Sequence, residues 1–84
     1  APGVAGTREL LRQASDRVFE SSLTTLTSRL VDAGIDNASA RSVAVSVVAL
    51  LEGAFLLSRA ARTTEAMTAT GDAAVALVEA ALGR

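Results

Sequence analysis

The stretch Arg41–Arg59, RSVAVSVVALLEGAFLLSR, decides the fold of this chain. Between Val43 and Leu57, the only strongly polar side chains are Ser46 and Glu52. A helix on the surface of a soluble protein has one apolar stripe and one polar face. This segment has apolar residues on nearly every side, so it predicts a central helix that protein must cover all round.

The chain is too small to provide that cover by itself. Its 84 residues make one domain, and much of the apolar half of the composition is alanine, with Phe19 and Phe55 as the only aromatic residues. Such side chains bury little area each, and small domains have small cores. We therefore expect a second copy of the chain to complete the core, which makes a homodimer.

Composition excludes several classes of function. The net charge of −1 comes from eight Arg and nine acidic residues that are not segregated, and Tyr and Trp are absent. The chain therefore lacks a basic stripe for phosphates and the usual platforms for base stacking. Cys, His and Lys are also absent, which removes disulfides, most zinc sites, Ser-His-Asp triads and Schiff-base chemistry. We expect no cofactor and no enzyme.

A membrane span is not expected either. The apolar run from Val43 to Leu57 is shorter than the roughly 20 residues that cross a bilayer, and Glu52 interrupts it. No segment resembling a secretion signal stands at the N-terminus. We therefore expect a cytoplasmic protein.

Local signals predict an all-α fold with three antiparallel helices, at about residues 8–33, 37–61 and 65–82. The opening APGVAG, residues 1–6, predicts a loop, with Thr7 as the cap of the first helix. Gly34 predicts the end of that helix, with Ile35 folding back on Leu30 in a Schellman motif. Asp36 then caps the second helix, and Thr63 or Thr64 caps the third.

The central helix carries two different faces when its residues are projected at 100° intervals. Its larger side chains, which we expect to pack within the chain, are Val43, Val47, Leu50, Ala54 and Leu57. The adjoining seam of small residues comprises Ser42, Ser46, Ala49, Gly53 and Ala60. The third helix has a matching flank of small residues: Ala66, Ala69, Ala73 and Ala80.

Small side chains let helix backbones approach closely. We therefore predict that the seam and the alanine flank meet a symmetry mate, so that the last two helices of each protomer form a four-helix bundle across the dimer. The alternative is that the seam packs against the chain's own helices, with Gly53 merely tolerated.

Glu52 is the strongest candidate for a ligand contact. It projects in nearly the same direction as Arg41 and Arg59, and a buried carboxylate without a partner is costly. Glu52 either pairs with an Arg or a backbone N–H on another helix or chain, or it faces a cavity and orients a ligand's polar group. A single carboxylate without a base or metal is not a catalytic site. The residues that would line such a cavity, or else form ordinary core, are Phe19, Ser22, Leu26 and Phe55, with Glu52 and Arg59.

The order of motifs from residue 32 to 67, DAGIDNASARSVAVSVVALLEGAFLLSRAARTTEAM, resembles the C-terminal end of TetR-family transcriptional regulators. The matching features are a helix ending in Ala-Gly-Ile-Asp, an apolar helix with Leu-Glu-Gly-Ala and Ser-Arg-Ala, and a last helix that opens with Thr-Glu and ends in ALGR. APGVAG resembles the loop before the third-last helix in one branch of the family.

This resemblance implies a dimer built from the last two helices and an effector pocket enclosed by the helices before them. It also implies a longer protein, because the helix-turn-helix domain that reads DNA in this family is not among these residues. We expect residues 1–84 to be a single C-terminal regulatory and dimerisation domain that takes a hydrophobic small-molecule effector. The alternative is a stand-alone helical module that binds another protein's helix.

Overall fold

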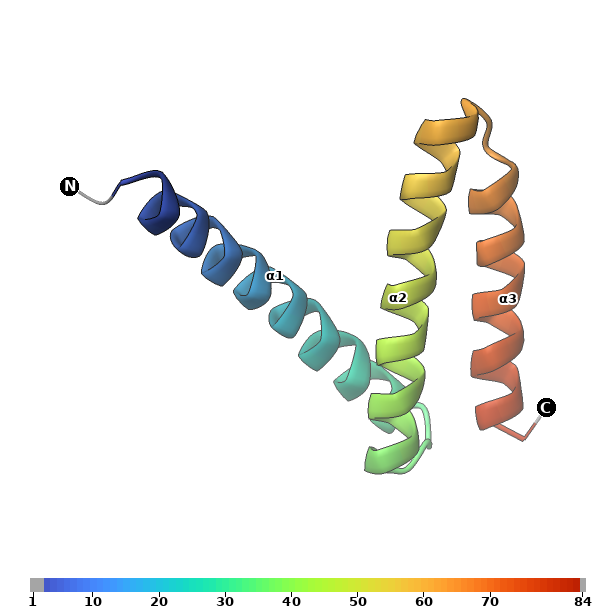
Figure 1. Cartoon of the computed structure of the whole chain (residues 1–84). Coiled ribbons are helices and arrows are strands. Elements are labelled where there is room, and N and C mark those ends of the chain that lie inside the picture. The colour runs from blue at the N-terminus through green and yellow to red at the C-terminus, as the bar shows by residue number, and fades with distance from the viewer. Residues whose placement is uncertain (1–2, 84) are drawn as a thin grey trace.

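The computed structural model describes residues 3–83 of the chain. These residues form three α-helices: α1 (Val4–Asp32), α2 (Asn37–Ala61) and α3 (Glu65–Ala81) (Figure 1). No strand occurs in this described part. The predicted all-α fold with three helices is therefore confirmed, and the bounds of α2 are those predicted.

The start of α1 corrects the sequence analysis. Within the described part of APGVAG, the helix already begins at Val4, and Gly3 occupies the N-cap position. The backbone N–H of Thr7 donates to the carbonyl oxygen of Gly3 at 3.0 Å, so Thr7 lies inside the helix and does not cap it. Glycine is an acceptable N-cap residue, and no proline interrupts the helix after it. Residues 1–2 of the predicted loop lie outside the described residues.

The turn between α1 and α2 forms as predicted. Gly34 has φ +107°, a conformation that disfavours side chains. The N–H of Ile35 donates to the Leu30 carbonyl at 3.1 Å, and the N–H of Gly34 donates to the Val31 carbonyl at 2.9 Å, the two bonds of a Schellman motif. Both Leu30 and Ile35 are buried. The end of α1 is therefore fixed by its backbone and by an apolar contact.

The starts of α2 and α3 are also defined by short-range hydrogen bonds. The Ser39 N–H donates to Asp36 Oδ1 at 3.0 Å, and this bond holds the pKa of the Asp36 carboxyl below its ordinary value. At α3, Thr64 is the N-cap residue but its side chain makes no capping bond. The Glu65 N–H donates instead to Thr63 Oγ1 at 3.3 Å.

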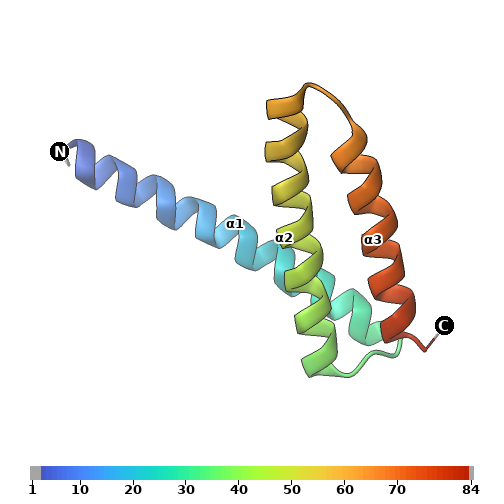
Figure 2. The same cartoon turned by 45° about the vertical axis from the view of Figure 1, so that its right-hand side comes forward.

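The helix α2 lies between the other two. It runs antiparallel beside α3 to form a hairpin, and α1 crosses behind its N-terminal end (Figures 1 and 2). The core sits where these elements meet and is built on Leu30, Ile35, Ala40 and Ala44. The partly buried side chains packed against this core come from all three helices and from the residue that follows α3. They are Leu23, Leu26, Val43, Val78, Ala81 and Leu82.

The N-terminal part of α1 leaves this core and extends away from the hairpin (Figure 2). Residues 7–22 are all exposed. The radius of gyration is 15.8 Å, whereas a compact domain of this length has about 12 Å. The single chain is thus an open structure with a core at one end.

Candidate functional site

The two halves of α2 have different surroundings. In the N-terminal half, Ala40 and Ala44 are completely buried. In the C-terminal half, Phe55, Leu56 and Leu57 are 62%, 71% and 63% exposed. The prediction that Leu57 packs within the chain is therefore wrong for the single chain, because Leu57 stands one helical turn after Gly53, on the seam side of α2, and the described residues leave it exposed.

The predicted seam of α2 lies on the side of the hairpin away from α1. Its residues stand about half a helical turn from Ala40 and Ala44, which belong to the core cluster that α1 helps to form. Ser42, Ala49 and Ala60 are exposed, while Ser46 and Gly53 are half-buried.

The alanine flank of α3 lies on this same side. Ala69, Ala73 and Ala80 are exposed, and Ala66 is half-buried. They project away from Val75 and Val78, which face α1 across a groove. The structure thus brings the seam and the flank together as one surface, which we call the small-residue face.

Gly53 in this face is not required to be small by its own chain. A Cβ atom built at Gly53 would have no neighbouring atom within 4 Å. The absence of a side chain is therefore unexplained within the monomer, although it would allow another helix to approach closely.

Three larger residues that were not predicted from the sequence also belong to the small-residue face. Val45 and Leu56 are 44% and 71% exposed, and Leu77 is 37% exposed. Helical spacing could have found them, because Val45 and Leu56 align with Ala49 and Ala60, and Leu77 stands between Ala73 and Ala80.

A groove opens on the opposite side of the hairpin, between α1 and α3. Its volume is about 370 Å³. Apart from Glu79 at α3, the described residues that line it are apolar: Leu26, Leu30, Val47, Ala74, Val75, Val78 and Leu82. The hairpin therefore has an apolar groove on the side of α1 and the small-residue face on the other.

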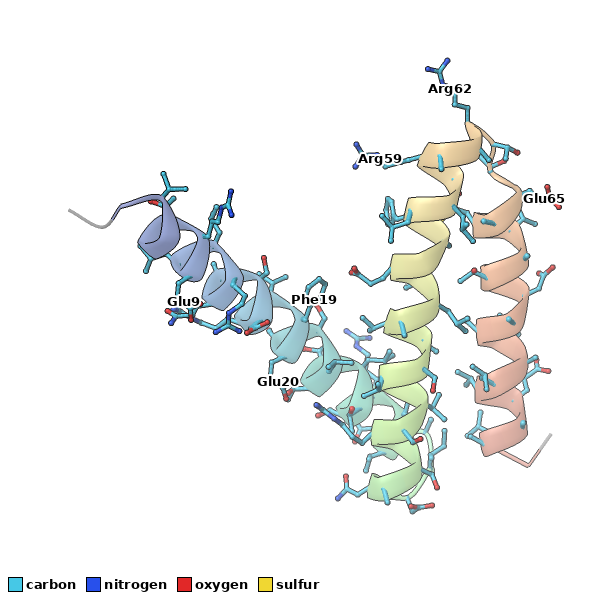
Figure 3. The ribbon with its side chains drawn as sticks, viewed as in Figure 1. Glu9, Phe19, Glu20, Arg59, Arg62 and Glu65 are labelled. Atoms are coloured by element: carbon cyan, nitrogen blue, oxygen red, sulfur yellow. The ribbon has the colours of Figure 1, made fainter. Side chains whose placement is uncertain are left out.

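The six candidate ligand residues do not share one cavity in the described chain. Leu26 lines the groove. Phe55 and Arg59 line a separate hollow at the turn between α2 and α3. Phe19, Ser22 and Glu52 line neither of these hollows and are exposed. Figure 3 shows Phe19 on the side of α1 that faces the angle between α1 and α2, whereas Glu9 and Glu20 lie on its other side.

The charged residues mark the solvated side of α1. Arg12 contacts Glu9 at 2.6 Å and Asp16 at 2.6 Å. The bond to Glu9 raises the pKa of Arg12, and the same bond lowers the pKa of Glu9. Arg41 of α2 donates to both carboxylate oxygens of Glu20 at 3.1 and 3.2 Å. This exposed ion pair therefore links α1 to α2.

One feature of α2 differs from the expectation about membranes. The whole helix has 25 residues, and its most apolar stretch has a mean hydropathy of 1.8, so its length and composition would allow it to cross a bilayer. The expected run of Val43–Leu57 was shorter because it left out the flanking helical turns. The core helices of soluble proteins have the same length and composition, so this property does not by itself indicate a membrane.

Taken together, these features define an all-helical domain with a small-residue face on one side of its hairpin and an apolar groove on the other. The family described as "Transcriptional regulator LmrA/YxaF-like, C-terminal domain" matches residues 1–73. The chain therefore belongs to the TetR family of transcriptional regulators as a C-terminal domain of this type, which confirms the resemblance in its sequence. Comparison with curated proteins and with solved structures found no match to the chain.

Proposed function

We propose that this chain is the dimerisation and effector-sensing portion of a bacterial, cytoplasmic TetR-type repressor. In this proposal, the small-residue face pairs with the same face of a second copy, and the opposite side of the hairpin receives a hydrophobic small molecule. Contact with operator DNA belongs to the helix-turn-helix domain typical of the family, because these helices carry a net charge of −1 and no basic stripe.

The observation that supports this proposal most strongly is the exposed area. The chain exposes 6045 Å², whereas a folded monomer of its mass exposes about 4,700 Å². The excess of roughly 1,400 Å² is larger than the area of about 800 Å² that each partner buries in a standard interface. The exposed arm of α1 at residues 7–22 contributes to this excess, and a second copy seated on the hairpin would cover a further part of it.

The small-residue face suits this partner. Ser42, Ser46, Ala49, Gly53 and Ala60 on α2, with Ala66, Ala69, Ala73 and Ala80 on α3, let two hairpins pack with short distances between their helix axes. The larger side chains of Val45, Leu56 and Leu77 would fill the spaces between the helices. Two hairpins related by a two-fold axis then form a four-helix bundle.

The opposite side suits an effector. The groove is within the range of small-molecule sites, about 300–1,000 Å³. On α1, Ser22 lies four residues before Leu26, and Phe19 lies three residues before Ser22. These three residues therefore share one stripe of the helix. We propose that an effector seated in the groove extends along this stripe toward the part of α2 that carries Glu52, Phe55 and Arg59.

Two glycines provide a matched test of the dimer. Gly53 belongs to the small-residue face, while Gly71 follows the spacing of Val75 and Val78 on the groove side. Neither position has a neighbour within 4 Å of an added Cβ. Leucine at either position should therefore be accommodated by the monomer and favour the helix by up to about 1 kcal/mol.

Gly53→Leu should overfill the interface and weaken association by about 1–3 kcal/mol, whereas Gly71→Leu should leave association unchanged. Light scattering coupled to size exclusion, over a dilution series, gives the two dissociation constants. Equal dimer affinity in both variants would contradict the proposed interface.

A further inference from the structure

The charge of the residues that line the groove between α1 and α3 indicates which ligands would fit it. Of the eight described residues that line it, Glu79 alone bears a charge. Val75 and Glu79 are four residues apart on α3, so they stand one helical turn from each other at the same edge of the groove. Glu79 is exposed, which places its carboxylate at the rim of the groove.

Among the described residues that line the groove, no other one offers a polar anchor comparable to this carboxylate. Leu26 and Leu30 form the α1 wall, Val47 belongs to the α2 floor, and Val75 and Val78 form the α3 wall. A ligand in this groove would bury an apolar body against these side chains. The single charge that complements the site would be positive and would stand at the end of that body nearest Glu79.

We propose that the groove selects a ligand with an apolar body of one or two rings and one cationic nitrogen, which the Glu79 carboxylate holds at the rim. This inference rests on the proposed function, since it names the chemical class of the effector. The apolar body supplies most of the affinity, and the ion pair discriminates between ligands of the same shape. An exposed ion pair contributes little, so the discrimination amounts to roughly two- to fivefold in the dissociation constant.

Three probes with one naphthalene body test the charge preference: 1-naphthylmethylamine, which is cationic at pH 7, 1-naphthalenemethanol, which is neutral, and 1-naphthylacetic acid, which is anionic. The chain contains no Trp or Tyr, so naphthalene fluorescence anisotropy reports binding without interference from the protein. The expected order of affinity is amine, alcohol, then acid. Equal affinity for the amine and the alcohol would overturn the proposed class.

Three variants locate the effect. Glu79→Gln should remove the difference between the amine and the alcohol. Asp72→Asn removes the same charge from α3 at a position seven residues, or about 10 Å, away, and should preserve the difference. Val75→Phe places a ring in the groove from a position that is 58% exposed. It should weaken all three probes at least tenfold while the circular dichroism spectrum stays unchanged.

The oligomeric state of the same samples separates this inference from the proposed function. If the chain is dimeric and binds none of the probes, the groove is not a ligand site of this class and the inference fails alone. If the chain is monomeric and binds none of them, the proposed function fails with it. If Asp72→Asn also removes the charge preference, the preference comes from the combined negative charge of α3 and not from one carboxylate. That result would also overturn the assignment to Glu79.

Discussion

The two halves of α2 both contain largely apolar sequence but meet different neighbours. Residues 37–48 lie between α1 and α3, and their alanines at 40 and 44 are buried. Residues 49–61 have α3 on one side, and Phe55, Leu56 and Leu57 are exposed on the others. Hydrophobicity along the chain therefore does not tell which half of the helix the chain itself covers.

This difference shows that the position of α1 decides which half of α2 has helices on two sides. The Schellman turn at Gly34 and the Asp36 cap send α1 diagonally across the N-terminal half of α2, so its remaining length points away from the C-terminal half. The covered half provides the stability of the single chain. The uncovered half provides part of the small-residue face that we assign to a partner, and this face continues to Ser42 and Val45 in the other half.

The largest expected effect comes from the covered half. Leu30 is 6% exposed and belongs to the core cluster, so Leu30→Ala should lower the free energy of unfolding by about 2–4 kcal/mol. Leu10→Ala deletes the same atoms from a residue that is 57% exposed and should cost less than about 0.5 kcal/mol. Urea unfolding followed by circular dichroism at fixed protein concentration measures both. Similar losses in the two variants would remove the distinction between core and exposed arm.

The next effect concerns the uncovered half. Leu56→Ala should weaken dimer association by roughly 2 kcal/mol, because the side chain moves from water to an apolar interface when the dimer forms. Sedimentation velocity over a range of concentrations gives the dissociation constant. The helix content at dilutions where the chain is monomeric should stay the same, since Leu56 is exposed there. A dissociation constant equal to that of the unchanged chain would place Leu56 outside the interface.

A smaller effect is expected at the turn that directs α1. Gly34→Ala puts a side chain on a residue with φ +107° and should lower the free energy of unfolding by about 1 kcal/mol. Gly34→Asn should lower it less, because Asn tolerates positive φ better. Thermal unfolding of the three proteins gives the order. An alanine variant as stable as the glycine protein would show that the turn does not depend on this conformation.

The smallest effect is a pH dependence at the start of α2. The Ser39 N–H lowers the pKa of the Asp36 carboxyl in the folded chain, so this carboxyl stabilises the fold above its ordinary pKa. That contribution is lost as the pH falls below about 4 and through the lowered value. Asn is also a good cap, so Asp36→Asn should match the parent protein at pH 7 and lose less stability on acidification. Parallel unfolding curves between pH 7 and 3 measure this difference. Identical pH dependence in both proteins would contradict it.

Local signals explain why most of the fold could be predicted. Gly34 with Ile35, and Asp36 three residues before Ser39, specify hydrogen bonds within a few residues, and those bonds are present. The start of α1 was not predicted, because Gly3 suits a helix cap as well as a loop and no side chain at the N-cap marks the choice.

The candidate site was less predictable, because it depends on the angle between helices. The seam and the alanine flank could be read from helical spacing, and the structure places them on one face of the hairpin. The groove depends on where α1 crosses, so Glu79 and Val75 could not be assigned to it from spacing on α3 alone. The same angle explains why Phe19 and Phe55 lie on different, diverging parts of the chain.

Sedimentation equilibrium of the unchanged chain, from about 1 to 100 μM, tests the central claim most directly. We predict that the mass rises toward twice the 8.5 kDa of one chain, because the small-residue face and the exposed end of α2 are covered by a second copy. A mass of 8.5 kDa across the whole range would contradict this claim.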